Sequence, residues 1–242
     1  AEYYVALSVI LIGSTISRLG LVNFILNKFS GLKSINREIH YLFSLTSSAF
    51  LVSLVISVLL CIFLFIPFFE KYKLSITAGL LAIPFHAVCF CFCAYLQSKL
   101  KFVYSNLLQN FVSYLITVFI ILMSKDSNWI LFSIPIGYAT SCLCAYILIT
   151  KNLKVGSRFP IKLLSLNSLV RKTRSFLITD LAVVSTNWLP ILLSSIFLNK
   201  DDTGVLSLIL KLSWLISFML ISANSVFAPV ISKLYKNLSD HQ

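Results

Sequence analysis

Long apolar runs separated by short charged segments dominate the pattern of hydrophobic and polar positions along the chain. Each run is about 23–29 residues long, and a helix needs roughly 20 apolar residues to cross a bilayer. The pattern predicts seven membrane-spanning helices, at residues 3–27, 41–69, 74–97, 102–124, 128–150, 175–198 and 204–232. Porin-type barrels instead show runs of about ten residues with alternating polarity. We therefore predict an all-α, polytopic membrane helix bundle.

The composition supports this class of protein. Of the 242 residues, 58% are hydrophobic and only 12% are charged, whereas soluble domains are about 45–50% apolar and about 25% charged. The chain has seven Gly and six Pro and no repeated polar tract, which argues against a disordered or fibrous protein. The same two percentages exclude a soluble globular domain.

The net charge of +12 is explained by its distribution along the chain. If the first span runs from outside to inside, fifteen of the 20 Lys and Arg residues lie on the inner side, four lie in outward loops, and Lys211 lies within the last span. This asymmetry is what the positive-inside rule predicts. It argues against nucleic-acid binding, and we expect a multi-pass membrane protein whose basic segments face the cytoplasm. Residue 1 then lies outside, and we expect an upstream span to precede it.

The one long connection, residues 151–174, carries seven basic residues and no acidic residue. One interpretation is a surface helix whose cations face anionic membrane lipids. The other is a linker between two helix bundles. The two interpretations are compatible.

Three charged residues fall inside the predicted spans: Arg18, Asp180 and Lys211. A charge at the centre of a span costs about 2.5–3.5 kcal/mol on insertion scales, so such residues usually face a bundle interior or a wet cavity. Arg18 and Asp180 are also close enough to the inner interface to act as interfacial anchors. Lys211 is deeper, which favours a role in a cavity.

Polar residues also recur at helical spacing along several spans. The stripes contain His86, Cys89, Cys93 and Gln97 in the third span; Asn106, Gln109, Asn110, Ser113 and Thr117 in the fourth; Asp180, Asn187 and Ser194 in the sixth; and Ser207, Lys211, Trp214, Ser222 and Ser225 in the seventh. Small hydroxylated residues permit close helix packing, whereas amides and charges favour a hydrated central cavity. A cavity lined by Arg and Lys suits an anionic ligand such as a phosphate or pyrophosphate.

Catalytic and metal-binding patterns are missing from the sequence. Cys89, Cys91 and Cys93 resemble a ligand cluster, but on a helix Cys91 points away from the other two, and small buried hydrophobes are the better interpretation. His86 is better explained as a packed or cavity histidine than as a base. No phosphate-binding glycine loop, nucleophile elbow or paired acid and base is found. We therefore expect no enzyme activity, no cofactor and no metal.

Several stretches, in the same order along the chain, resemble the oligosaccharide flippases, the Wzx-like exporters of O-antigen, teichoic acid and other polysaccharides in the multidrug/oligosaccharidyl-lipid/polysaccharide exporter superfamily. They are residues 17–21 followed by Asn23, residues 81–85, 95–97, 101–102 and 107–110, and residues 187–189, 202–205 and 224–235. The last stretch, Asn224 to Tyr235, carries the most specific similarity. The resemblance covers most of the chain.

This resemblance implies a fold of two six-helix lobes around a central cavity. Residues 1–150 would hold helices two to six of the first lobe, residues 151–174 the basic cytoplasmic connection, and residues 175–242 the first two helices of the second lobe and a tail. The chain would belong to a multi-pass transporter of the bacterial cytoplasmic (inner) membrane, which acts in polysaccharide or lipopolysaccharide biosynthesis. This transporter would move an undecaprenyl-pyrophosphate-linked oligosaccharide across the membrane by alternating access.

The implied site has a charged centre and a hydrogen-bonding wall. Arg18 and Lys211 would hold the anionic head of the lipid-linked oligosaccharide, and Asp180 and His86 are candidates for ion coupling. The wall residues would be Gln109, Asn110, Asn187 and Ser207. Polysaccharide polymerase or assembly proteins are expected partners. Two alternatives stay open: a drug or metabolite exporter of the same superfamily, and a truncated, non-transporting membrane module.

Overall fold

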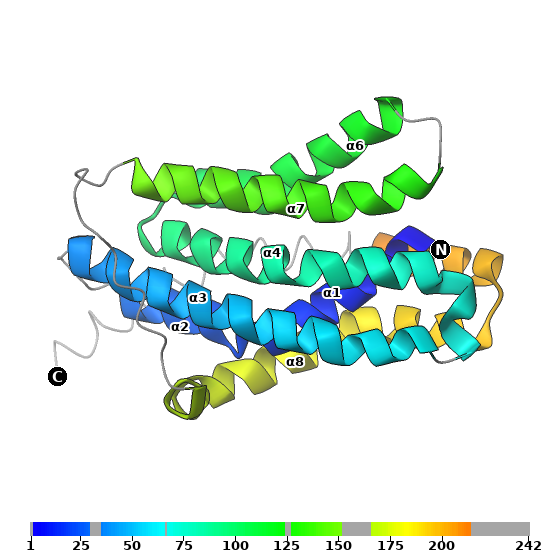
Figure 1. The fold of residues 1–242 in the computed structure, drawn as a ribbon, viewed down its shortest axis with the longest axis horizontal. Coiled ribbons are helices and arrows are strands. Elements are labelled where there is room, and N and C mark those ends of the chain that lie inside the picture. Colours follow the sequence, from blue (N-terminus) through cyan, green and yellow to red (C-terminus); the bar gives the residue numbers. More distant parts are fainter. Residues whose placement is uncertain (1, 30–34, 66, 124–126, 152–165, 214–242) are drawn as a thin grey trace, which may run out of the picture.

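The computed structural model describes residues 2–29, 35–65, 67–123, 127–151 and 166–213 (Figure 1). Its elements are α1 (Glu2–Arg18), α2 (Leu21–Phe29), α3 (Ile35–Leu60), the 3₁₀ segments η1 (Cys61–Phe65) and η2 (Pro67–Tyr72), α4 (Lys73–Ser98), α5 (Phe102–Asn106), the π-helical segment η3 (Leu107–Val112), α6 (Ser113–Met123), α7 (Ser127–Thr150) and α8 (Leu166–Phe197). Residues 200–213 are also helical. Throughout these ranges the protein is helical and contains no strand, which confirms the predicted all-α class.

Five helical segments are long and apolar enough to cross a membrane, and the bent pair of α1 and α2 brings the number to six. The five segments are Glu38–Leu60, Glu70–Ser98, Phe102–Ile120, Trp129–Thr150 and Leu169–Phe197. These segments and the bent pair overlap the first six predicted spans, but the second helix ends at Leu60 and not at the predicted residue 69, because the chain continues as 3₁₀ segments. The seventh, residues 204–232, is described only to residue 213, so most of it lies outside the described residues. The count of seven and the two-lobe organisation stay predictions.

Helix α4 occupies the centre of the described bundle (Figure 1). It contacts α1, α2, α3 and α7, and α6 packs on the far side of α7. Helix α8 packs mainly against α1 and α2, on the opposite side of α4 from α7. Because other helices surround α4, 78% of its most apolar 18-residue stretch is buried, compared with 11% of the corresponding stretch of α8. Cys89, Cys91 and Cys93 accordingly lie in the hydrophobic core.

The first predicted span is broken rather than continuous. Leu19 and Gly20 adopt positive φ angles of 51° and 75°, which lie in the left-handed region that L-residues other than glycine rarely occupy. The axes of α1 and α2 consequently differ by 53°. A Cβ atom on Gly20 would lie 2.6 Å from the Leu177 nitrogen and 2.7 Å from the Thr173 oxygen. Glycine therefore permits both the left-handed turn and the close approach of the α8 backbone.

The basic connection is shorter than predicted at its C-terminal end. Helix α8 begins at Leu166, so residues 166–174 continue the predicted sixth span without interruption. Arg171, Lys172 and Arg174 are exposed on this extension. Residues 152–165 of the predicted connection lie outside the described residues.

An ion pair joins three helix ends on the side that the charge distribution predicts to be cytoplasmic. The Lys99 ammonium at the C-cap of α4 lies 2.6 Å from a carboxylate oxygen of Glu38 in the first described turns of α3. The same ammonium donates a hydrogen bond of 3.2 Å to the carbonyl of Phe29, the last residue of α2. Glu38 is 2% exposed and Lys99 is 27% exposed, so the carboxylate is cut off from water while the ammonium is not.

Candidate functional site at the helix break

Arg18 is buried at the end of α1, directly before the helix break, with 7% of its surface exposed. Its Nε donates to the Ser14 carbonyl at 3.2 Å and its Nη2 donates to the Thr15 hydroxyl at 2.7 Å. The guanidinium also lies 4.6 Å from the centroid of the Phe90 ring in α4. Part of its role is local, because a cation in the last turn of a helix interacts favourably with the helix dipole and free carbonyls.

The Arg18 charge is not neutralised by direct contact with a carboxylate. Among the described residues, no carboxylate oxygen lies within 4.0 Å of its guanidinium. Asp180 of α8 is close enough for an electrostatic interaction with Arg18, but its Oδ1 instead accepts a hydrogen bond of 2.8 Å from the Asn23 amide of α2. Asp180 is half-buried. The helix break therefore gathers a cation, an anion and an amide from three helices.

His86 of α4 belongs to the same neighbourhood. Its ring stacks on Phe90 with a centroid separation of 4.2 Å and meets Tyr138 edge-on at 4.6 Å. The side chain is fully buried, and within the described structure neither ring nitrogen has a hydrogen-bond partner. Phe90 is thus shared by Arg18 and His86. The sequence favours a packed or cavity histidine over a base, and the aromatic contacts show that the ring is packed against Phe90 and Tyr138.

Lys211 lies apart from this cluster, against α8. Its ammonium is 3.4 Å from the centroid of the Trp188 ring, and its side chain is half-buried. Trp188 packs with Ala6, Leu7 and other residues of the first half of α1. This location is two or more turns from Arg18 along α1, so the two predicted cations form separate sites.

The predicted hydrogen-bonding wall is divided by α4. Asn187 donates to the Val183 carbonyl at 2.7 Å, and the buried Ser207 donates to the Thr203 carbonyl at 2.7 Å, so both have contacts within their own helices. The remaining two wall residues, Gln109 and Asn110, lie in η3, which packs against α7 and α4. Gln109 is half-buried and Asn110 is exposed. These last two lie on the opposite side of α4 from α8.

The predicted site residues line neither of two cavities in the described part of the chain. One has a volume of about 250 Å³ and an apolar lining, and the other has about 10 Å³ between α1, α6 and α7. The hydrated, positively charged cavity expected from the polar stripes is not one of these two. The structure instead assigns Asn23 and Phe90 to the Arg18 neighbourhood. Asn23 could have been recognised from its place five residues after Arg18, whereas no sequence signal pointed to Phe90.

Comparisons with known proteins assign no family. No family model, curated protein or solved structure matches this chain. The polar cluster at the break between α1 and α2 is therefore the main indication of function.

Proposed function

We propose that this chain is part of a membrane transporter that moves an undecaprenyl-pyrophosphate-linked oligosaccharide to the outer leaflet. One observation carries the proposal. Arg18 places a buried guanidinium within a membrane-spanning bundle, at a break between two half-helices, without an ion-paired carboxylate among the described residues. Ionisable residues inside a membrane mark substrate pathways, and broken helices are common at transporter binding sites.

The chemistry of the guanidinium favours a phosphate. Arginine has five N–H donors in a planar fork that matches phosphate oxygens. The described hydrogen bonds of Arg18 start from Nε and Nη2, which leaves Nη1 for another acceptor. Rearrangement of the bundle would be needed to admit a ligand, as alternating access requires. Asn23 would add a neutral donor, and Asp180 and His86 would be the candidates to exchange a proton or cation during the cycle.

The predicted site residues take different positions in this proposal. Arg18 is the centre of anion binding, and Lys211 beside Trp188 is a second cation that the head group would meet on its path. Asn187 and Ser207 belong to the same side of α4 as α8. Gln109 and Asn110 would contribute only through a surface that faces a different part of the complete transporter.

Binding can be measured on the full chain in lipid nanodiscs with undecaprenyl pyrophosphate as the ligand. Arg18→Met removes the donors but keeps much of the apolar stem. Hydrogen bonds to charged groups contribute about 1.5–3 kcal/mol, which corresponds to roughly 10–150-fold in affinity. We expect the Met variant to lose about that much, Arg18→Lys to lose less, and Lys101→Gln, at an exposed position on α5's N-cap, to bind normally.

Two results would refute the proposal. One is the absence of undecaprenyl pyrophosphate binding to the wild-type chain, and the other is equal binding by the Met variant. Binding of cationic amphiphiles in place of the pyrophosphate would favour the drug-exporter alternative. In a full-length transporter we further expect Lys211→Ala to abolish complementation of a flippase-deficient strain. Normal surface polysaccharide in that strain would remove Lys211 from the path.

A further inference from the structure

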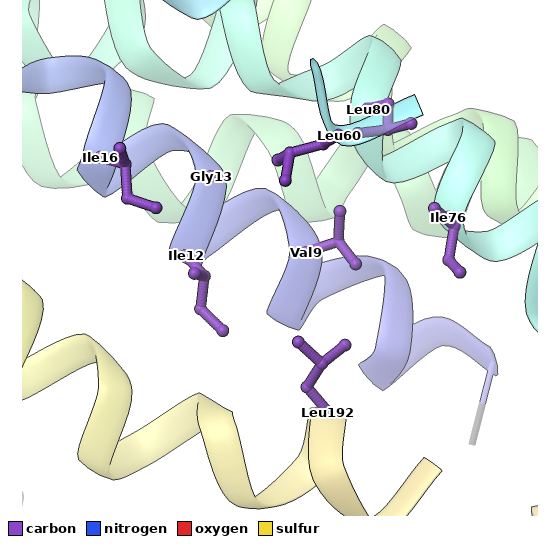
Figure 2. A pocket seen from close by; sticks show the side chains of 8 residues that line it. All are labelled: Val9, Ile12, Gly13, Ile16, Leu60, Ile76, Leu80 and Leu192. Atoms are coloured by element: carbon purple, nitrogen blue, oxygen red, sulfur yellow. The ribbon is translucent and has the colours of Figure 1, made fainter. Parts of the chain in front are cut away.

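A cavity of about 250 Å³ lies between α1, α3, α4 and α8 (Figure 2). Its lining is entirely apolar and consists of Val9, Ile12, Gly13, Ile16, Leu60, Ile76, Leu80 and Leu192. Figure 2 shows the side chain of Leu192 on α8 facing the same space as Val9 and Ile12 on α1. Gly13 contributes to the volume because it has no side chain.

The size and lining of the cavity indicate a hydrocarbon occupant. An engineered apolar cavity of about 150 Å³ stays dry and binds benzene, and this cavity is larger. It offers no hydrogen-bond partner to water. Every lining residue belongs to, or directly adjoins, a segment that can cross the membrane, so lipid chains surround the helices that form its walls.

A cluster of charges lies at the end of α4 nearest to the cavity residue Ile76. Ile76 and Leu80 lie four and eight residues after Tyr72 along α4, which is about 6–12 Å at the helical rise. Tyr72 is 1% exposed, and its hydroxyl has no hydrogen-bond partner within the described structure. The ammonium groups of Lys71 and Lys200 lie 5.2 Å and 5.8 Å from the centroid of its ring. Tyr72 therefore stands between the apolar cavity and the charged end.

This charged end contains both signs. Lys200 is paired with Glu2 at 2.6 Å, and Lys71 donates to the Leu198 carbonyl at 2.7 Å. Within the described structure neither Lys71 nor its exposed neighbour Glu70 has an ion-pair partner. The same end also carries Lys73, Asp201 and Asp202. A balanced mixture of cations and carboxylates complements a zwitterionic head group better than a purely anionic one.

We propose that the cavity binds one acyl chain of a phosphatidylethanolamine-type phospholipid in the leaflet on the side of Lys71. The lipid phosphate lies beside Lys71, and its primary ammonium donates to the neighbouring carboxylates, Glu70 first among them. The Tyr72 hydroxyl donates to an ester or phosphate oxygen of the lipid. This site is separate from the Arg18 cluster, and binding there does not depend on the transport proposal.

Native mass spectrometry of the full chain, purified in detergent, tests the site. Phosphatidylethanolamine, phosphatidylcholine and phosphatidylglycerol with identical acyl chains are added in turn. Phosphatidylcholine has no N–H donor and phosphatidylglycerol has no cation. We expect one retained phosphatidylethanolamine, with a preference of about tenfold over each of the other lipids. A Glu70→Gln/Lys71→Gln double variant should lose that preference, and Lys101→Gln should keep it.

A pair of tryptophan variants tests the cavity itself. Leu192→Trp fills the space, and Leu193→Trp places the same side chain on the next residue, which is 46% exposed. We expect only the first to reduce phosphatidylethanolamine retention, by about tenfold. A phosphatidylethanolamine with a diazirine on its acyl chain can also be photolysed with the wild-type protein, which needs no variant. The label should attach to Ile76, Leu80 or Leu192.

Three results would overturn the proposal: equal retention of the three lipids, equal effects of the two tryptophan variants, or a label that maps away from the cavity. A preference for phosphatidylglycerol would refute the head-group assignment. Retention of polyprenyl phosphate in place of phosphatidylethanolamine would refute the phospholipid proposal. It would indicate instead that the cavity binds the transported substrate. Failure of the transport proposal alone would leave these lipid measurements unchanged.

Discussion

Substitution of Gly20 by alanine tests whether the break between α1 and α2 is held by α8. The new Cβ would lie 2.6 Å from the Leu177 nitrogen and 2.7 Å from the Thr173 oxygen. Both are backbone atoms of a helix, so neither can rotate away as a flexible side chain could. The φ angle of +75° adds a second, independent cost.

The expected destabilisation is the sum of these two effects. The left-handed conformation costs a non-glycine residue roughly 1–2 kcal/mol, and overpacking in a close-packed interior costs typically about 1–3 kcal/mol. We therefore expect Gly20→Ala to destabilise the chain by about 2–5 kcal/mol. At roughly 2–4 °C per kcal/mol for a chain of this size, Tm should fall by about 4–20 °C.

A thiol-reactive dye measures the unfolding, because Cys89, Cys91 and Cys93 are buried in the core until the helices separate. Gly13→Ala is the matched control. Its Cβ would also have a nearest neighbour at 2.6 Å, but that neighbour is the terminal methyl of the Ile83 side chain, which can move, and alanine is favoured in a helix interior. We expect a change in Tm of only a few degrees. If Gly20→Ala matched wild type, or the two variants behaved alike, the break would not depend on the α8 contact.

Three further predictions concern titratable side chains that are buried or paired. His86→Phe keeps the ring stacking but removes two buried nitrogens without described partners, so Tm should rise; a fall would show that a ring nitrogen is hydrogen-bonded. Lys99→Met leaves the buried Glu38 carboxylate unpaired and should lower the free energy of unfolding by about 3–5 kcal/mol. Glu38→Gln should lower it less, because Lys99 can reach water. The same denaturation assay measures both variants, and the reverse order would contradict this reasoning. The hydrogen bond to Glu2 raises the pKa of Lys200 above its ordinary 10.5, so its small stabilising contribution is present below that pH and is lost as the pH rises through the raised value. Lys200→Gln should flatten that part of the pH–stability curve, and an unchanged slope would refute the assignment.

Much of the fold follows from hydropathy alone. Each of the first six predicted spans contains a helix, because a membrane-spanning segment must satisfy its backbone hydrogen bonds internally. A single long apolar run can do so as an α-helix. The break at Leu19 and Gly20 escaped this reasoning, since the apolar run continues through both residues. It depends on a left-handed turn fitted against α8, and that contact joins positions more than 150 residues apart.

The site was predictable only in part, for a similar reason. The cost of burying a charge in a membrane identified Arg18 and Asp180, and the structure places both at the helix break. Helical periodicity could not show that Asp180 accepts a hydrogen bond from Asn23, or that Phe90 contacts both Arg18 and His86. Periodicity gives the face of a helix, whereas the neighbour of that face depends on how the helices are packed.

The ion pair between Glu38 and Lys99 limits how the bundle can rearrange. Because one ammonium contacts the ends of α2, α3 and α4, a motion that separates these ends would have to break the ion pair or the hydrogen bond to Phe29. Helix α8 packs chiefly on α1 and α2, and the hydrogen bond from Asn23 to Asp180 joins it to α2. If the proposed transporter rearranges without breaking these contacts, α8 would have to move at its close approach to Gly20, two residues after Arg18.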